Sequence, residues 1–192
     1  MRYLGIDLGT TTVTGMVLDV ETGEVVAVRT VANACEVTGS EDRQRGRSEW
    51  DAEVMMALVL AVMREAVAAG GPVAGIGVTG QMHGMVLVDG AGQPVGPFMG
   101  WQDRRGMATM AGVQETYVDR MRAVARETEA LERGCRPHTG YLGTTLFWMA
   151  VQDRLPGRAV TASFLPDYVV SVLTGTQPVS RVAIAGQDVT PK

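Results

Sequence analysis

The chain has 192 residues, of which 46% are hydrophobic and 20% are charged, and its formal net charge is −4. This composition is typical of a globular protein, and the length is sufficient for one sizeable hydrophobic core. Lys and Arg are scattered rather than clustered, which argues against a nucleic-acid or anionic-membrane partner. The longest apolar stretch, residues 54–62, is too short to span a bilayer, and the first residues lack the pattern of a signal peptide. We therefore expect a cytoplasmic protein with no membrane partner.

The cysteine pattern excludes a zinc site of the usual kind. Only Cys35 and Cys135 are present, far apart, without a Cys-x-x-Cys or Cys/His spacing. We expect both to be reduced thiols rather than a disulfide, as is usual in the cytoplasm.

Three β-rich runs open the chain, at residues 2–8, 13–20 and 24–31, and the tight turns between them predict an antiparallel meander. Residues 33–48 are polar and contain arginines, so we expect an exposed loop. A helical period over residues 51–69 predicts a helix that Ser48 or Asp51 caps and that Gly70-Gly71-Pro72 ends. Residues 73–79 then indicate a buried strand, and residues 85–89 another.

The second half of the chain continues the alternation of strands and helices. Residues 98–102 indicate a short strand, 116–131 and 144–153 two helices, 160–164 a strand, and 167–173 a helix ended by Gly175. This order predicts an α/β fold in which helices flank a mixed sheet. There is no internal repeat or linker, so residues 1–192 are expected to form one domain.

A candidate phosphate-binding bend follows the first strand. Asp7 precedes Gly9, Thr10, Thr11 and Thr12. Gly9 permits a sharp turn, after which backbone N–H groups and threonine hydroxyls can point at one anion. Asp7 would repel a phosphate unless Mg²⁺, or a water bound to it, lies between them. The alternative is an ordinary β-hairpin with common turn residues.

A candidate sugar-binding corner follows the strand at residues 73–79. It consists of Gln81, Met82, His83 and Gly84. Gln and His side chains together can donate to and accept from sugar hydroxyls, and the glycine lets the backbone approach a ligand. The alternative is that His83 is a turn histidine with all its hydrogen bonds satisfied.

A second candidate segment closes the next strand. Trp101 can stack on the apolar face of a sugar, while Asp103 and Arg105 can bond its hydroxyls. The alternative is that Trp101 belongs to the core and Asp103 caps a helix.

These segments occur in the order found in a known family. Residues 6–11 resemble the first phosphate motif of the sugar kinase, actin and heat-shock chaperone ATPase superfamily, whose domains are ribonuclease-H-like. Residues 80–84 resemble the sugar-contacting segment of xylulokinases and sedoheptulokinases in the FGGY group of carbohydrate kinases. Residues 101–105 resemble the Trp-Asn/Gln-Asp-x-Arg segment of the same enzymes. Residues 139–141, 147–148, 166–170 and 173–175 follow in the family's order, so the resemblance covers nearly the whole chain.

The resemblance implies an ATP-dependent ketose kinase of two domains, with ATP and Mg²⁺ in the cleft between them. It implies that Asp7 is the catalytic and metal-associated carboxylate of this chain, through a water, and that the bend binds phosphate. The sugar positions that it implies are Gln81, Met82, His83, Gly84, Trp101, Asp103 and Arg105. Gln102 and the run at residues 167–170 favour sedoheptulose over D-xylulose as the ketose.

Two features depart from the family pattern. The resemblance places the general base, an Asp, and the adenosine-binding segment beyond the length of this sequence, and residues 179–187 lack the expected Ser-Asp pair. We therefore expect an incomplete amino-terminal FGGY domain without the second, nucleotide-binding domain, inactive by itself. Its exposed apolar surface would favour a homodimer. A sugar-binding or interaction module without catalysis, and a member of the superfamily with an unrelated ligand, stay open as alternatives.

Overall fold

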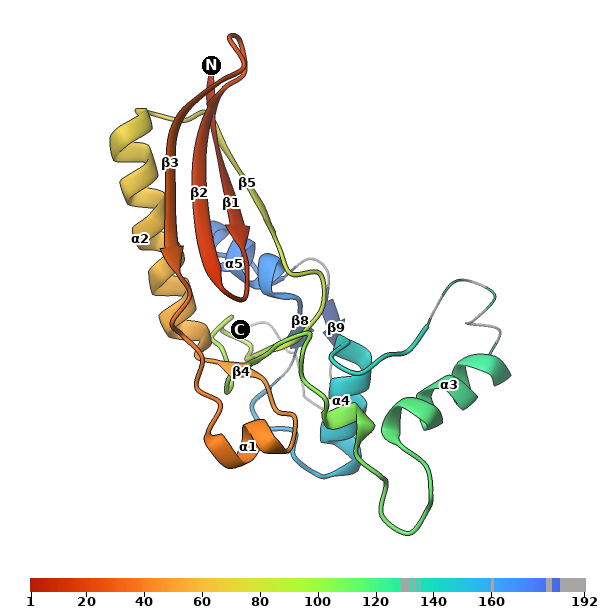
Figure 1. Cartoon of the computed structure of the whole chain (residues 1–192). Helices are drawn as coiled ribbons and strands as arrows, with labels where there is room; N and C mark the ends of the chain where they lie inside the picture. Colours follow the sequence, from red (N-terminus) through yellow and green to blue (C-terminus); the bar gives the residue numbers. More distant parts are fainter. Residues whose placement is uncertain (129–131, 133, 135, 160, 179–180, 184–192) are drawn as a thin grey trace.

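A four-stranded mixed sheet forms one end of the molecule (Figure 1). The structure is a computed structural model that describes residues 1–128, 132, 134, 136–159, 161–178 and 181–183. The strands β1 (Arg2–Leu8), β2 (Thr12–Asp19) and β3 (Glu24–Ala32) form the expected antiparallel meander. The strand β5 (Gly75–Gly80) adds to the free edge of β1 and runs parallel to it, which gives the order β3-β2-β1-β5.

Two helices cover one face of this sheet. The helix α2 (Ala52–Gly70) begins at Asp51, whose carboxylate accepts hydrogen bonds from two N–H groups of the first turn, at 3.0 and 2.9 Å. The helix α5 (Leu165–Thr174) ends at Gly175, which adopts the left-handed conformation, as expected. Alternate residues of β1 point at these helices and are buried, whereas Tyr3, Gly5 and Asp7 point to the opposite, open face.

Smaller elements build the other end of the molecule. The strands β6 (Val86–Val88), β8 (Thr161–Ser163) and β9 (Arg181–Ala183) form one small sheet, and β4 (Glu49–Trp50) pairs with β7 (Phe98–Met99). The helices are α1 (Ser40–Gln44), α3 (Tyr117–Glu127), α4 (Leu142–Val151) and the short 3₁₀ helix η1 (Arg105–Met107).

The strand β6 joins the two hydrophobic cores. Val86 and Val88 pack into the core under the large sheet, while Met85 and Leu87 pack into the second core against α3 and α4. All four side chains are fully buried. Because one strand contributes to both cores, the two ends of the molecule are held together by packing as well as by the chain.

Two expectations about local structure are wrong. Residues 33–48 are not a wholly exposed loop, because Asn33, Cys35, Thr38 and Ser48 are buried and α1 lies within the segment. The strand at residues 73–79 is not buried: β5 is an edge strand whose residues are half-buried or exposed. Alternation of apolar residues predicts a strand but does not distinguish the centre of a sheet from its edge.

Several other boundaries shift by a few residues. The helix α3 begins after Thr116, which forms a capping box with Asp119, and residues 129–131 and 160 of the expected elements lie outside the described residues. Cys35 is a buried free thiol, and burial raises its pKa. Cys135 lies outside the described residues. Among the described helices, none combines the length and the apolar character that crossing a bilayer requires.

We expect Gly70→Ala to destabilise the fold. A Cβ atom at Gly70 would lie 2.7 Å from Cβ of Val17, in the contact between α2 and β2. Overpacking of this kind costs about 1–3 kcal/mol of unfolding free energy. Urea denaturation measures the loss. Gly77→Ala is the matched control, because a Cβ there meets nothing within 4 Å; equal losses in both variants would contradict the packing argument.

Candidate functional site

The bend between β1 and β2 is held by its own backbone and by Asn33. The N–H of Gly9 donates to the carbonyl of Thr12 at 3.0 Å, and a Cβ at Gly9 would lie 2.8 Å from the same oxygen. The side-chain amide of Asn33 donates to the carbonyl of Gly9 at 2.9 Å. The backbone N–H of Asn33 donates to the carbonyl of Thr11 at 2.8 Å. Thr11 and Thr12 are exposed and Thr10 is half-buried, so the bend presents hydroxyls outward. Asn33 was not among the residues predicted for the site, because it belongs to no recognisable motif.

Asp7 stands on the open face of the sheet, one residue before this bend begins to turn. Its neighbours in register are Thr14 on β2 and Thr79 on β5. Next to them Gly5 and Gly77 lack side chains, which leaves an open hollow of about 440 Å³ over this face. The carboxylate is exposed and so can meet a ligand.

Asp7 does not belong to a cluster of metal-ligating side chains in the described part of the chain. Within the described residues, no three His, Cys, Asp or Glu side chains are grouped so that they could hold an ion. A single carboxylate beside hydroxyls fits Mg²⁺, which keeps several waters and binds through one or two carboxylates together with phosphate oxygens. The residues present therefore fit an ATP–Mg²⁺ complex held largely by its own phosphates.

The second corner lies directly beside the bend. Because β1 and β5 are parallel, Leu8 pairs with Gly80, and both strands end at the same edge of the sheet. The N–H of Gln81 donates to the carbonyl of Leu8 at 3.2 Å. A Cβ at Gly80 would lie 2.6 Å from that of Leu8, so the close approach depends on a glycine. The candidate phosphate bend and the Gln-Met-His-Gly corner are thus neighbours at this edge of the sheet.

Gln81 carries an unused hydrogen-bonding group. Both its side-chain nitrogen and its side-chain oxygen are buried, and neither has a hydrogen-bond partner among the described residues. Leaving a buried amide unsatisfied costs stability, so such a group indicates a place where a ligand or water completes the bonds. Met82, by contrast, is 76% exposed and contributes nothing to the core.

Aromatic rings gather around His83. Its imidazole stacks on Tyr141 with ring centroids 3.8 Å apart, and His138 lies 5.7 Å from Tyr141. Partial burial, together with the nearby His138, lowers the pKa of His83 below its ordinary value of 6.5. The imidazole is therefore neutral at pH 7 and can both donate and accept a hydrogen bond.

Glycines bring Trp101 to the same corner. The N–H of Gly84 donates to the carbonyl of Gly140 at 3.0 Å, and Gly140 touches the backbone of Trp101 so closely that a Cβ would lie 1.9 Å from its carbonyl oxygen. Trp101 is 48% exposed and free to face a ligand. Tyr141 was not predicted as a site residue. The signal for it was present in the sequence, because the segment 139–141 follows in the family's order.

Asp103 and Arg105 bond each other and neighbouring residues. Asp103 is fully buried, and its carboxylate accepts hydrogen bonds from the N–H of Ser48 at 3.0 Å and from Nε and Nη2 of Arg105, each at 2.8 Å. Arg105 also bonds Glu49. These contacts leave no oxygen of Asp103 open to a ligand, so this geometry does not support the direct sugar contacts expected for the pair; it favours a positioning role for the loop at residues 101–105.

The bend and this loop share a cavity of about 370 Å³. We call it the bend cavity; it is lined by Thr10, Thr11, Gln102, Arg104, Arg47 and neighbouring residues. Threonine hydroxyls and the side chains of three arginines, the third being Arg43, therefore line one space next to the candidate phosphate bend.

We expect Asp103→Asn to destabilise the protein by about 3–5 kcal/mol, because it removes the fully buried one of the two carboxylates that pair with buried Arg105. Chemical denaturation followed by circular dichroism measures this. Asp153→Asn, at an exposed position, is the matched control and should change stability by less than about 0.5 kcal/mol. A loss no larger than the control's would show that the buried pair contributes nothing to the loop.

The sequence of the chain is similar to those of known carbohydrate kinases. Residues 2–187 match the N-terminal domain of the FGGY family of carbohydrate kinases. A xylulose kinase from Streptomyces rubiginosus is 29% identical over 185 residues, which are 95% of this chain and 36% of that protein. One from Lactococcus lactis is 27% identical over 177 residues, 91% of this chain and 33% of that protein.

Solved structures show the same fold. The xylulose kinase from Rhodospirillum rubrum superposes with a TM-score of 0.71 at 22% identity, over 90% of this chain and 34% of that one. Plasmodium falciparum glycerol kinase with ADP gives 0.65 at 17% identity, over 91% and 34%. These likenesses confirm the expected ribonuclease-H-like α/β fold. The chain spans about a third of the length of the curated relatives. It belongs to the FGGY family of carbohydrate kinases, whose N-terminal domain it matches.

Proposed function

We propose that this chain is the sugar-binding half of an ATP-dependent ketose kinase. The observation that carries the proposal is the hydrogen bond between Gln81 and Leu8, which holds a hydroxyl-rich bend and an unsatisfied amide at one edge of the sheet. A kinase needs this juxtaposition, because the accepting hydroxyl of the sugar must lie in line with the transferred phosphate.

The sugar would bind at the corner formed by Gln81, His83, Trp101 and Tyr141. The Gln81 amide can donate and accept, and neutral His83 can do the same, so together they can satisfy neighbouring hydroxyls. Trp101 offers an exposed ring to the apolar face of the sugar. Met82 and Gly84 complete the segment, with Gly84 holding the corner against Gly140.

The phosphates of ATP would bind at Thr10, Thr11 and Thr12, with Asp7 holding Mg²⁺ through a water. The exposed hydroxyls and backbone N–H groups of the bend suit an anion. When bound, Mg²⁺ neutralises charge on the phosphate groups. Asp7 would orient the metal's water, and Asn33 would keep the bend in shape by its bonds to Gly9 and Thr11.

Phosphoryl transfer would also need the residues that the resemblance places outside this sequence, namely the general base and the adenosine-binding segment. The chain is therefore proposed to bind a ketose but to turn none over by itself. The matched curated relatives span about three times its length. A cytoplasmic location and a homodimer are part of the same proposal.

The relatives favour xylulose as the ketose. Four curated relatives, two from Streptomyces species and one each from Lactococcus lactis and Staphylococcus xylosus, are xylulose kinases. Gln102 had favoured sedoheptulose, but in the structure it lines the bend cavity, together with Thr10 and Thr11. We therefore propose D-xylulose first and sedoheptulose second.

Isothermal titration of the chain with D-xylulose, and separately with sedoheptulose, tests the proposal. We expect D-xylulose to bind, and Gln81→Ala to weaken binding about tenfold or more because two buried hydrogen bonds to the ligand are lost. Gln44→Ala, at an exposed position of α1, is the matched control. Absence of binding by the folded chain to either ketose would overturn the proposal, and tighter binding of sedoheptulose would reverse the order of substrates.

The pH dependence of ketose binding tests the role of His83. Because the pKa of His83 is lowered, its imidazole stays neutral as the pH falls from about 8 to its ordinary 6.5, and the affinity should be constant over this range. Below this range protonation removes the acceptor, and the affinity should fall. In His83→Asn the affinity should not show this fall below pH 6.5, because the side chain does not titrate there. A decline that begins well above pH 6.5 in the unsubstituted protein would contradict a neutral His83.

A further inference from the structure

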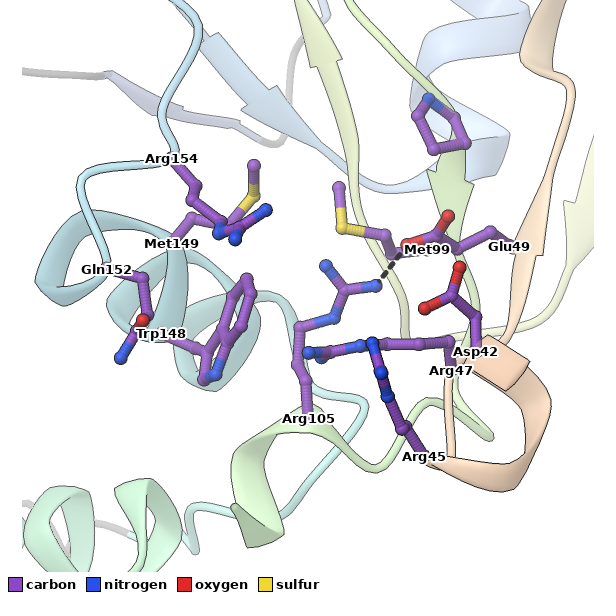
Figure 2. A pocket seen from close by; sticks show the side chains of 11 residues that line it. Asp42, Arg45, Arg47, Glu49, Met99, Arg105, Trp148, Met149, Gln152 and Arg154 are labelled. Atoms are coloured by element: carbon purple, nitrogen blue, oxygen red, sulfur yellow. Dashed lines mark hydrogen bonds and ion pairs between the residues drawn. The ribbon is translucent and has the colours of Figure 1, made fainter. Parts of the chain in front are cut away.

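A further cavity, of about 650 Å³, lies between three parts of the chain (Figure 2). These parts are the helix α4, the segment between α1 and β4, and the residue Arg105. Arginine side chains from three parts of the chain point into it beside the ring of Trp148. We call it the arginine pocket, after Arg45, Arg47, Arg105 and Arg154, which line it with Trp148. Neither the phosphate bend nor the Gln-Met-His-Gly corner contributes a residue to its lining.

The lining of the arginine pocket contains four guanidinium groups and two carboxylates, those of Asp42 and Glu49. Two carboxylates outside the lining also contribute, because Asp103 pairs with Arg105 and Glu41 lies 4.0 Å from Arg45. Glu49 is already bound by Arg105, as the dashed line in Figure 2 marks. Arg105 is 4% exposed, and its bonds to Asp103 fix its orientation. Arg105 is therefore a fixed part of the wall whose charge is already compensated by two carboxylates.

Arg47 has a buried nitrogen without a partner: its Nη1 forms no hydrogen bond with any of the described residues. Its guanidinium lies 4.4 Å from the centroid of the Trp148 ring, and that of Arg105 lies 5.1 Å from it. Burial, and then the positive charge of Arg105, lower the pKa of Arg47. Two guanidinium groups held at one aromatic ring leave room for an anion that would pair with both.

We propose that the arginine pocket is a binding site for a phosphate-bearing small molecule, separate from the kinase site. Guanidinium forks match phosphate oxygens and bind them in pairs. The volume is in the range of small-molecule sites and exceeds what one phosphate group needs, which favours an organic phosphate such as a sugar phosphate. The site does not depend on the proposed kinase function, because no ketose or ATP takes part in it.

Two arginines distinguish this pocket from the bend cavity. Arg47 lines both cavities, so its substitution alone does not separate them. Arg154 lines only the arginine pocket, and Arg104 lines only the bend cavity. Arg154 is exposed, so that its replacement leaves the core unchanged.

Isothermal titration with inorganic phosphate, ribose 5-phosphate and ribose tests the proposal. We expect both phosphates to bind and ribose not to bind. We expect Arg47→Ala and Arg154→Ala each to weaken phosphate binding about tenfold, since each removes a charged donor. Arg104→Ala and Arg64→Ala, the latter on the exposed side of α2, are matched controls and should change the affinity by less than about twofold. Circular dichroism of each variant checks that it is folded.

Tighter binding of ribose 5-phosphate than of phosphate would identify an organic phosphate as the occupant, and equal binding would identify the phosphate group alone; both results support the site. Loss of binding in Arg104→Ala but not in Arg154→Ala would place the anion in the bend cavity and overturn the proposal. Unchanged binding in Arg154→Ala, or no binding of either phosphate at about 10 mM, would overturn it as well.

Discussion

The parallel pairing of β5 with β1 is the constraint on which the candidate site depends. It makes both strands end at the same edge, so that the bend after Leu8 and the corner after Gly80 leave the sheet side by side. Parallel strands need a long crossover connection, and α2 is part of the connection between β1 and β5. The helix packs against β1, β2 and β3 of the same sheet. A side chain at residue 80 would collide with Leu8. The position of the site is thus fixed by backbone, before any functional side chain is considered.

Backbone contacts also fix the rest of the corner and leave its side chains free. Gly84 bonds Gly140, and Gly140 lies against Trp101, so three distant segments meet through their backbones. The side chains of Trp101 and Met82 are consequently exposed, and that of Gln81 is left without a partner. A buried side-chain amide without hydrogen-bond partners, within an otherwise well-packed fold, is typical of a site that a ligand completes.

The sequence predicted best those features that depend on neighbours along the chain. The meander, α2 with its Asp51 cap and the Gly175 stop of α5 follow from periodicity and capping. Residues 33–48 were mispredicted because their structure depends on distant contacts, such as that of Asn33 with Gly9. Asp103 illustrates the same limit at the site. Its residue type suits a sugar contact and a buried ion pair equally, and only the positions of Ser48 and Arg105 in space decide for the ion pair.

The loop at residues 101–105 has one side in each of the two proposed sites, with Trp101 at the sugar corner and Arg105 in the arginine pocket. Asp103 joins them, since its carboxylate holds Arg105 and its carbonyl accepts a hydrogen bond from Thr139, two residues before Tyr141. Coupling between two sites requires an element with two arrangements, each favoured by one ligand state. A fully buried carboxylate that accepts four hydrogen bonds is a poor candidate for such an element. An anion that pairs with Arg47 and leaves the bond from Arg105 to Asp103 intact would therefore bind without altering the sugar corner. Only an anion that drew Arg105 away from Asp103 would disturb the hydrogen bond between Asp103 and Thr139. Through Thr139 it would then affect the Tyr141 ring that stacks on His83.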